Sequence, residues 1–444
     1  MPRIVLVGAG SVEFTRNLLG DILSSAALRS SDIVLHDIDP ERLSTAERMA
    51  RWTATTLGAS PTISAHLDRR EALAGADFVV NTIQVGGARA TQVDFDVPAR
   101  FGLRYTIADT IGVGGVFRGL RTIPVVLGIA HDMEEICPDA FLLNYTNPLA
   151  IVVRAVSEAT SIRVVGLCHS VFWTIDRLAG YLGLPRDEID SSSAGLNHHA
   201  FVLRLEHRGR DLHPALRDFV TAGRVPDDDL VRAELFERLG FYPTESSEHH
   251  AEYNPWYIGK ADAAGDAVER FHVPIGEYLD RVAHNLDEYA ETRRMLDAGE
   301  AFEIERSGEY AATIAEAMTT GVPARIVANV INGGTQNGGA LIPNLEPGVC
   351  VEVPALVDGL GVQPVAMGPL PLHLAAYIRG AADMQGLTVR AALDRDRAAI
   401  GHAVMTDPIV QSRLTLGDAW RLTDQMIEAE AEWLPAWLGG SAAG

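Results

Sequence analysis

Cysteine is scarce in this sequence: the chain of 444 residues contains three, Cys137, Cys168 and Cys350. A small, odd number in a long chain excludes a disulfide-stabilised scaffold and is typical of a reducing compartment. The chain lacks any run near the ~18 uninterrupted apolar residues that a membrane helix needs, and its start, MPRIVLVGAG, lacks the segments of a secretory signal. We therefore expect a cytoplasmic protein with no membrane partner.

Positive charge is also scarce. The 37 Lys and Arg residues face 59 Asp and Glu residues, which gives a formal net charge of −22. Nucleic-acid binding relies on Lys and Arg to neutralise phosphates, so the composition argues against a nucleic-acid partner. Hydrophobic residues make up 47% and charged residues 22% of the chain, as in ordinary globular proteins.

The first part of the chain alternates short apolar strands with helical patterns. This alternation predicts a parallel sheet with helices on both faces, a Rossmann-type doubly wound α/β fold, which we assign to residues 1–195. The predicted strands are 3–7, 33–36, 62–65, 78–82, 141–144 and 163–166.

After about residue 195 the alternation ends, and a second, α+β domain is predicted over residues 196–444. We expect it to serve substrate binding and oligomerisation. A strand is predicted in HHAFVLRLEHRG, and strands and turns are predicted over 325–355, which is rich in Gly, Asn and Val. Helices are predicted near 214–240, 274–297, 303–320, 372–397 and 413–439.

A glycine-rich turn follows the first predicted strand. Gly8 permits a tight turn, and Gly10 lets a pyrophosphate approach the backbone. The N–H groups at the start of the helix, at Ser11 and Val12, then bind the anion. Glu13 occupies the third glycine position of the dinucleotide fingerprint, so the motif is incomplete.

Two further residues belong to this predicted cofactor site. Asp37 ends the second strand, where a carboxylate accepts hydrogen bonds from the ribose hydroxyls and would repel the 2′-phosphate of NADP. Asn81 lies at the end of the fourth strand. The pattern favours NAD, and the alternative is a glycine turn in a sheet protein that binds no cofactor.

Polar residues also follow the next two strands, at the sheet edge where ligands bind in such folds. Asn147, before Pro148, suits either ligand binding or a helix N-cap. Cys168 is either a buried small hydrophobic residue or, together with His198, a ligand of a divalent metal. The spacing of this pair matches no local zinc motif.

The segment from Thr244 to Trp256 combines two histidines and three carboxylates with a tyrosine and a tryptophan. A solvated acidic loop would explain the glutamates but not the histidines and aromatic residues, so we interpret the segment as functional. Its candidate catalytic residues are Tyr253, His250 and Glu248.

Residues Asp109 to Gly115 are interpreted as a long glycine-rich loop after the fourth strand. The loop either forms a substrate lid with Asp109 as an acid, or it is a plain turn with Asp109 as a local cap. The arginines nearby contact the substrate or pair with acidic residues; they are Arg89, Arg118 and Arg121.

Together these motifs resemble glycoside hydrolase family 4, the NAD- and manganese-dependent glycosidases. The matching segments span residues 4–362 in order and read VGAGSVEF, LHDID, ADFVVNTIQVGG, NYTNPLAI, GLCHSV, GLNHHAF, NVINGG and VCVEVPALVDGLG. The resemblance implies that Cys168 and His198 bind Mn²⁺. It also implies that Asn147 contacts the sugar and that Asp37 binds the ribose of NAD.

The residues after the ligand cysteine vary among subgroups of the family and follow the substrate. Here they read Cys-His-Ser-Val, which resembles the α-galactosidases, and His169 suits an unphosphorylated sugar. The implied substrate is therefore a small-molecule α-galactoside. An α-glucosidase or α-glucuronidase of the same family is the nearest alternative.

The resemblance also implies a redox-assisted elimination and addition. NAD takes a hydride from C3, a base removes the C2 proton, and the metal stabilises the enediolate. The aglycone then leaves with help from an acid, Asp109 or His169. The phospho-glycosidases carry a catalytic tyrosine in a Tyr-Leu-Gln-Tyr-like segment, which this chain lacks, so Tyr253, His250 and Glu248 are the base candidates in that order.

Two other classes of protein remain as alternatives. A lactate/malate-type 2-hydroxy-acid dehydrogenase shares the early fold but needs a catalytic His–Asp pair and a carboxylate-binding arginine. A non-catalytic NAD sensor would lose the metal pair, which this chain retains. The Gly- and Asn-rich region 325–350 and the long helices suggest self-association as a homodimer or homotetramer.

Overall fold

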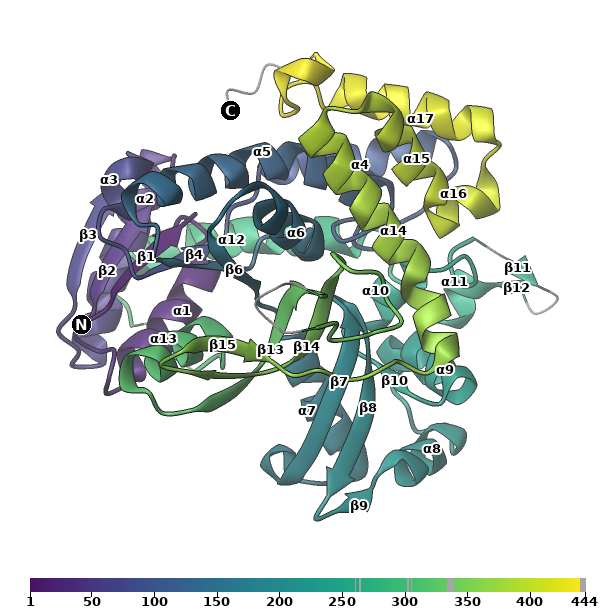
Figure 1. Ribbon diagram of the computed structural model, residues 1–444, viewed down its shortest axis with the longest axis horizontal. Helices are drawn as coiled ribbons and strands as arrows, with labels where there is room; N and C mark the ends of the chain where they lie inside the picture. The colour runs from purple at the N-terminus through teal and green to yellow at the C-terminus, as the bar shows by residue number, and fades with distance from the viewer. Residues whose placement is uncertain (260, 263–264, 302, 305, 334–338, 440–444) are drawn as a thin grey trace.

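One continuous mixed sheet runs through the molecule, with helices on both faces (Figure 1). The structure is a computed structural model, and it describes residues 1–444 apart from 260, 263–264, 302, 305, 334–338 and 440–444. The middle of the Gly- and Asn-rich region 325–350 thus lies outside the described residues.

Six parallel strands form the first part of the sheet in the order β3-β2-β1-β4-β5-β6. This is the strand order of dinucleotide-binding doubly wound folds, and it confirms the predicted Rossmann-type architecture. The strands lie close to their predicted bounds: β1 (Arg3–Val7), β2 (Asp32–His36), β3 (Thr62–His66), β4 (Phe78–Asn81), β5 (Phe141–Asn144) and β6 (Arg163–Gly166).

All six of these strands end in line, since His66 at the end of β3 pairs with His36. Val7 pairs with both His36 and Asn81, Asn81 pairs with Asn144, and Asn144 pairs with Gly166. Because parallel strands leave the sheet in the same direction, the loops that follow these residues open side by side at one edge. Polar residues that are far apart in the sequence are therefore brought together there.

Alternate side chains of each strand fill two different cores, as the two-residue period of a strand requires. Ile4 and Leu6 pack toward α1 and α2, whereas Val5 and Val7 pack toward α3, α5 and α6. These helices are α1 (Val12–Ser24), α2 (Pro40–Thr56), α3 (Arg69–Leu73), α5 (Gly112–Ile136) and α6 (Leu149–Ala159).

The second part of the sheet is antiparallel and joins the first at β6, where Asn329 pairs with Gly166. Its order is β13-β14-β7-β8-β10, with β15 on β14 and β9 on β8. The strands are β7 (Ile189–Leu196), β8 (His199–His207), β9 (Arg210–Asp211), β10 (Tyr242–Pro243), β13 (Ala324–Ile331), β14 (Cys350–Asp358) and β15 (Gly361–Pro364). The predicted division at 195/196 falls at the end of β7, which pairs along its length with β8.

The remaining elements are mostly helices of the second half, and α14 packs on α5 and α6 beside α15 and α17. Their bounds are α4 (Gly87–Arg100), α7 (Ser170–Leu182), η1 (Arg186–Glu188), α8 (His213–Thr221), η2 (Asp227–Asp229), α9 (Leu230–Leu239), α10 (Ser247–Glu252), β11 (Ala261–Asp262), β12 (Gly265–Asp266), α11 (Ala267–Arg270), α12 (Glu277–Ala298), α13 (Tyr310–Thr320), α14 (Leu372–Asp394), α15 (Arg397–Thr406), α16 (Pro408–Arg413), α17 (Leu416–Ala429) and η4 (Ala436–Leu438).

The predicted loop from Asp109 to Gly115 is wrong in its second half, because α5 begins at Gly112. The glycines there serve close packing: a Cβ on Gly114 would lie 2.3 Å from the carbonyl oxygen of Ala108, and one on Gly115 would lie 2.7 Å from the carbonyl carbon of Thr110. The sequence concealed α5 because it contains several glycines and a proline, which disfavour helix locally. Burial of the helix outweighs that preference.

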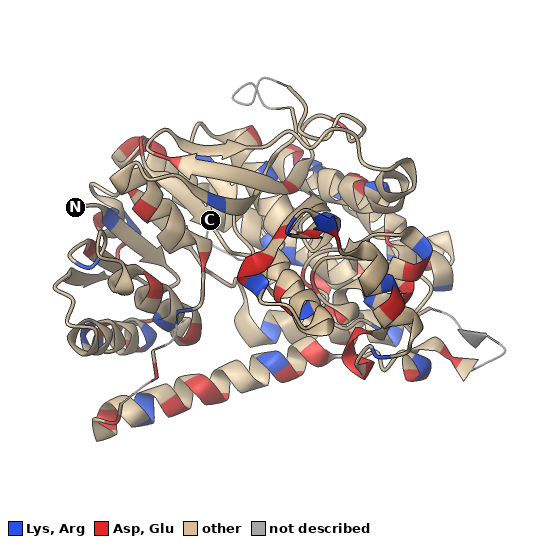
Figure 2. Cartoon of the chain, turned by 90° about the horizontal axis from the view of Figure 1, so that it is seen from below, with Lys and Arg blue, Asp and Glu red and all other residues tan. Residues whose placement is uncertain are grey.

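The helix α5 is long and apolar enough to cross a membrane by length and composition, but 78% of its most apolar window is buried inside the fold. It is therefore the central core helix. The helix α12 is its opposite: it extends along one edge of the molecule with acidic and basic residues along its length (Figure 2), and among its residues Thr292 alone is buried.

A fully buried ion cluster ties α5 to α4 and α17. The guanidinium of Arg121 donates to the Asp94 carboxylate at 2.6 and 3.0 Å and to the Glu430 carboxylate at 2.9 Å. All three side chains are at most 1% exposed. Burial of such charges is tolerated because each has a partner.

We predict that Arg121→Ala lowers the free energy of unfolding by about 3–5 kcal/mol, because it leaves two buried carboxyl groups without their cation. Urea denaturation measures this loss. The control is Arg204→Ala, which removes an exposed pair with Glu206 and should change stability by less than about 1 kcal/mol. Equal stability of the two variants would contradict the conclusion that the cluster stabilises the packing of α5 on α4 and α17.

Candidate active site

The glycine turn after β1 is shaped by close approach of other chain segments. Gly8 has a φ of 88°, and a Cβ there would lie 3.0 Å from the backbone of Thr82 and Ile83. A Cβ on Gly10 would lie 2.6 Å from an oxygen of Asp37. Both positions therefore exclude a side chain, which keeps the backbone of this turn open to a ligand.

Asp37 lies directly beside this turn. One of its carboxylate oxygens accepts the N–H of Gly10 at 2.8 Å and the other accepts the N–H of Asp39 at 2.9 Å. Ser11 precedes α1 and makes no side-chain cap, and Val12 begins the helix. The predicted cofactor residues of β1 and β2 thus occupy one edge of the sheet, as a dinucleotide site requires.

Asn81 is fully buried at the end of β4 and belongs to the same edge. Its amide donates to Asn144 at 2.8 Å and to the Thr146 hydroxyl at 3.2 Å. Its side-chain oxygen has no hydrogen-bond partner among the described residues. A buried acceptor without a partner is costly unless a ligand or water satisfies it, so Asn81 fits the predicted cofactor contact.

Cys168 and His198 meet beside this edge although thirty residues separate them. Cys168 follows β6, and its sulfur accepts the N–H of Ser170 at the start of α7 at 3.4 Å. His198 lies in the tight turn between β7 and β8 with a φ of 59°. The distance from Cys168 Sγ to His198 Nε2 is 3.2 Å.

A hydrogen-bonded chain sets the orientation of His198. The Thr110 hydroxyl donates to Asp109 at 2.7 Å and lies 2.9 Å from Nδ1 of His198. Because that hydroxyl proton is committed to Asp109, Nδ1 of His198 donates to Thr110, and Nε2 faces Cys168. Histidine ligands of metals are oriented in this way by a bond from the other ring nitrogen.

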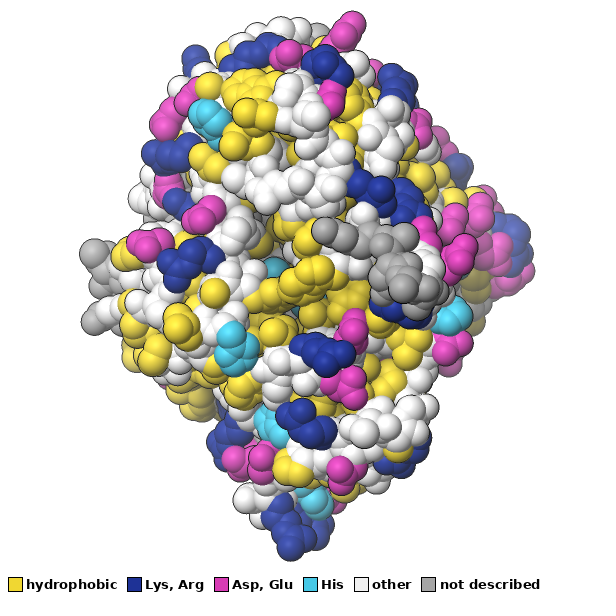
Figure 3. Space-filling view, turned by 90° about the vertical axis from the view of Figure 1, so that its right-hand side faces the viewer, with side chains coloured by type: hydrophobic (Ala, Val, Ile, Leu, Met, Phe, Trp, Pro, Cys, Tyr) yellow, Lys and Arg dark blue, Asp and Glu magenta, His cyan; other side chains and the backbone are white. Residues whose placement is uncertain are grey.

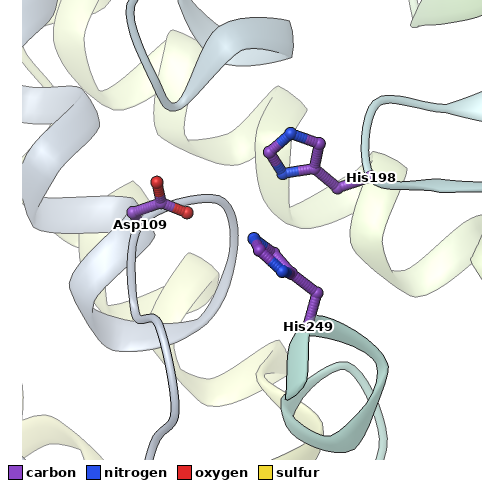
Figure 4. Close-up of side chains that lie close together, drawn as sticks. All are labelled: Asp109, His198 and His249. Atoms are coloured by element: carbon purple, nitrogen blue, oxygen red, sulfur yellow. The ribbon is translucent and has the colours of Figure 1, made fainter. Parts of the chain in front are cut away.

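The segment 244–256 contributes two further residues here, Glu245 and His249, that the sequence analysis does not single out. Asp109, His198 and His249 form one group with metal-ligand spacing, and Cys168, His198 and Glu245 form a second. Figure 4 shows the first group, with side chains from the loop before α5, the β7–β8 turn and α10 directed toward one another. The donor atoms and their burial therefore fit a metal ion.

The site favours positive charge at His198. Burial lowers the pKa of His198, but Glu245 and Cys168 outweigh burial and raise it to about 10. The pKa of Glu245 falls to about 2 against the effect of burial, because His198 and His249 lie close to it. The partly buried carboxylate and sulfur thus call for a cation near Nε2, either a proton or a metal ion.

The two predicted acid candidates differ in charge. Burial raises the pKa of Asp109, but Arg118, His249 and His198 together lower it below its usual value, and its carboxylate accepts the Asn147 amide at 2.8 Å. His169 is the opposite case. Burial lowers the pKa of His169, but its bond to Glu309 at 2.9 Å and the nearby Cys168 raise it to about 9.

The three predicted base candidates lie in different surroundings. Tyr253 is buried with its ring against His249. Its burial and, to a smaller extent, the charge of Glu252 raise its pKa well above the usual value. His250 is fully buried, with Nε2 2.7 Å from the Thr244 carbonyl oxygen. Glu248 forms an ion pair with Arg281 at 2.6 Å.

Glu252 positions the loop that carries Asp109, a role that the sequence analysis does not foresee. Its buried carboxylate accepts the backbone N–H groups of Thr106, Ile107 and Ala108 at 3.0–3.1 Å. A carboxylate that collects several backbone donors fixes the path of that backbone. No local sequence signal marks this contact, because the partners are about 145 residues apart.

The three arginines near the predicted loop have different partners. Arg121 is committed to the buried ion cluster described above. Arg118 is buried, donates to the Tyr278 hydroxyl at 3.1 Å, and lies near Asp109. Arg89 is mostly exposed and forms a two-point pair with Glu432 at 2.6 and 2.9 Å, so its substrate contact stays a prediction.

A cavity of about 380 Å³ lies under the C-terminal segment near Trp433 and Trp437. Of the residues singled out in the sequence it is lined by Arg121 alone, which belongs to the buried ion cluster. The candidate site is therefore defined by its side-chain chemistry. On the face shown in Figure 3, charged side chains of both signs lie among hydrophobic ones, and histidine atoms are visible in a hollow near the middle.

Comparison with known proteins identifies the family. The model described as Family 4 glycosyl hydrolase matches residues 3–184, and that of the Family 4 glycosyl hydrolase C-terminal domain matches residues 193–410. The α-galactosidase of Bacillus subtilis (strain 168) is 40% identical over 98% of this chain and 99% of its own. The α-galactosidase of Rhizobium meliloti (strain 1021) is 33% identical over 98% of this chain and 89% of its own.

A solved structure of a 6-phospho-α-glucosidase from gut microorganisms, in complex with NAD and Mn²⁺, has a TM-score of 0.82 at 21% identity, covering 98% of this chain and 99% of that one. This likeness shows the fold. The fold and the site together define an enzyme built on a dinucleotide-binding sheet with a Cys–His pair whose histidine is buried. The chain belongs to glycosyl hydrolase family 4, which confirms the family resemblance and excludes the dehydrogenase alternative.

The buried His199 gives a testable pH dependence. It is 3% exposed, and neither ring nitrogen has a hydrogen-bond partner among the described residues. Burial lowers its pKa to about 3, whereas an unfolded histidine has a pKa of about 6.5. As the pH falls, the unfolded chain therefore binds a proton at His199 before the folded chain does. The stability that His199 contributes above about pH 6.5 is lost as the pH falls below that value.

We predict that His199 lowers the free energy of unfolding of the wild type by about 2 kcal/mol when the pH is lowered from 7.5 to 5. His199→Phe keeps an aromatic ring in the site and should remove that part of the loss. Urea unfolding of both proteins at the two pH values measures the difference. An identical loss in wild type and variant would show that His199 is not held neutral by the fold.

Proposed function

We propose that this protein is an α-galactosidase that works with NAD and a divalent metal ion, and that Mn²⁺ is the preferred ion. The observation that carries the proposal is the oriented Cys168–His198 pair, 3.2 Å apart, at the same edge of the sheet as the glycine turn after β1. The Cys-His-Ser-Val pattern and the two α-galactosidases among its relatives support a galactoside as the substrate.

The cofactor residues follow from the sheet edge. Gly8 and Gly10 leave the backbone open, and Asp37 is placed for the ribose hydroxyls. At the helix start, the N–H of Ser11 donates to the Gly8 carbonyl at 3.1 Å, so we assign the N–H of Val12 to the pyrophosphate. We also assign the free acceptor of Asn81 to this site. When bound, NAD supplies reversible removal of a hydride from the sugar.

Cys168 and His198 hold the metal ion in this proposal, with Thr110 and Asp109 orienting the imidazole. When bound, a divalent ion supplies Lewis-acid polarisation of sugar oxygens. The side-chain amide of Asn147 donates to the ionised Asp109, and its side-chain oxygen accepts the N–H of Leu149, the first residue of α6, at 3.2 Å. This fixes its amide at the sheet edge, where we propose that it contacts the sugar.

His169 is the better of the two candidate acids. Its bond to Glu309 keeps it protonated, since the pKa is raised to about 9, and its side chain is 45% exposed and so accessible to a leaving group. Asp109 is ionised and already accepts two hydrogen bonds, from Thr110 and Asn147. We therefore propose that His169 donates the proton to the departing glycosidic oxygen.

Tyr253 remains our first candidate for the base. Its hydroxyl has no hydrogen-bond partner among the described residues, whereas His250 is bonded to Thr244 and Glu248 is paired with Arg281. Because the pKa of Tyr253 is raised, proton abstraction by its oxygen requires nearby positive charge. We further propose a homodimer or homotetramer in the cytoplasm that acts on small-molecule α-glycosides.

The proposal is tested by hydrolysis of p-nitrophenyl α-galactoside in a crossed set, with and without NAD, Mn²⁺ and a thiol reductant. We predict release of nitrophenol in the complete mixture only, and no accumulation of NADH, because the hydride returns in each turnover. Cleavage of the α-glucoside or α-glucuronide instead would change the assigned sugar. Stoichiometric NADH would contradict a hydrolase.

A second prediction concerns the sulfur ligand. Cys168→Ser should bind Mn²⁺ at least tenfold more weakly and lose most hydrolysis, because an alcohol is a far poorer ligand than a thiolate. The matched control is Cys137→Ala, since Cys137 lies in the core between the sheet and α5. Normal turnover of Cys168→Ser in the presence of a chelator would refute the assignment.

A further inference from the structure

The Cys168–His198 pair faces a carboxylate. Glu245 lies with one oxygen 3.7 Å from Nε2 of His198, and ligand atoms of Cys168, His198 and Glu245 all lie within 4.8 Å of one another. The Glu245 side chain is 17% exposed. Three electron-rich groups thus converge on a small, largely buried space.

The direction of the His198 ring makes this convergence informative. Nδ1 is occupied by Thr110, whose own proton goes to Asp109, so Nε2 is the nitrogen directed at both the sulfur and the carboxylate. Sulfur, carboxylate and imidazole lone pairs repel one another unless a cation lies between them. A metal ion at this point would take the place of a proton on Nε2 and meet all three groups.

The backbone holds Glu245 in this place at a conformational cost. Glu245 has a φ of 69° and His198 a φ of 59°, a region that L-residues with side chains rarely adopt. Left-handed residues of this kind persist where the surrounding structure imposes them, and they cluster at functional sites. Both residues of this facing pair are held in that way.

Two contacts impose the Glu245 conformation. The N–H of the preceding Thr244 donates to the Ala200 carbonyl at 2.9 Å, which extends the pairing of β10 with β8 toward the His198 turn. The buried Arg232 donates to the Glu245 carbonyl, and its own guanidinium is fixed by Asp229. The carboxylate is thus presented to His198 by rigid elements.

We propose that Glu245 is a third protein ligand of the metal ion held by Cys168 and His198. The proposal rests on the metal site of the proposed function and adds a ligand to it. Protein ligands that share one ion at about 2.0–2.3 Å lie roughly 3–4 Å from one another. The separations of 3.2 and 3.7 Å from Nε2 match that range.

The neighbouring group of Asp109, His198 and His249 has a different role. Both oxygens of Asp109 accept hydrogen bonds, from Thr110 and Asn147, so they are engaged in orienting other residues. Nδ1 of His249 lies 3.5 Å from the second oxygen of Glu245 and 2.8 Å from the Ser246 hydroxyl. His249 therefore steadies Glu245, as residues behind metal ligands commonly do.

The test measures metal affinity directly. Metal-free protein is saturated with NAD and titrated with Mn²⁺, and free Mn²⁺ is followed by electron paramagnetic resonance. We expect Glu245→Gln to raise the dissociation constant at least tenfold, because the amide keeps the size of the side chain but loses its charge. The exposed Glu237 on α9 supplies the matched control, and Glu237→Gln should bind Mn²⁺ as the wild type does.

Two further measurements keep the test decisive. NAD affinity and circular dichroism establish that the variant is folded, and Glu245→Asp, which keeps the charge but shortens the side chain, should lie between wild type and Glu245→Gln in Mn²⁺ affinity. With Co²⁺ in place of Mn²⁺, the sulfur-to-cobalt absorption band should persist in Glu245→Gln while the weaker visible bands change, because one ligand is lost.

The outcomes separate this proposal from the proposed function. If wild type and Glu245→Gln bind Mn²⁺ within twofold of each other, Glu245 is not a ligand, and a fall in turnover alone would assign it to proton transfer with the substrate. If the wild type itself binds no Mn²⁺ and hydrolyses the galactoside without it, the metal-dependent function fails as well. Weaker binding confined to the Glu245 variants supports the third ligand.

Discussion

The hydrogen-bonded chain from Asp109 through Thr110 to His198 joins the two parts of the molecule at the site. Asp109 and Thr110 precede the core helix of the parallel part, whereas His198 lies in a turn of the antiparallel part. Asn147 holds Asp109 from the sheet edge, and Glu252 holds the preceding residues 106–108 from the other side. The orientation of the His198 imidazole therefore depends on both parts being docked together.

The same contacts separate the charges of neighbouring groups. Asp109 is ionised chiefly because Arg118 opposes the effect of its burial, whereas His169 is protonated because Glu309 opposes the effect of its burial. His249 and His250 have their pKa values lowered by burial and are neutral. Groups of similar type thus occupy different protonation states at one pH, which is the condition for assigning separate acid and base roles.

Local sequence patterns predicted the parts of the structure that depend on local geometry. Gly8 and Asp37 were identifiable because a turn after one strand and an acid after the next have fixed positions in this fold. Cys168 and His198 required the family resemblance, since residue types alone favoured a buried, small hydrophobic cysteine. Glu245 could not be predicted, because its position depends on β10, a strand of two residues, and the helix α5 was concealed by glycines whose purpose is tertiary packing.

The carboxylates of the site also explain why a direct hydrolytic mechanism does not suit it. Retaining and inverting glycosidases use two carboxyl groups on either side of the scissile bond, one as acid and the other as nucleophile or base. Here each acidic residue described at the site already contacts another group of the protein. Asp109 accepts Thr110 and Asn147, Glu252 binds backbone amides, Glu309 holds His169, and Glu245 faces His198. Cleavage in such a site draws on chemistry at the sugar ring, and the dinucleotide-binding edge with the Cys168–His198 pair suits such chemistry.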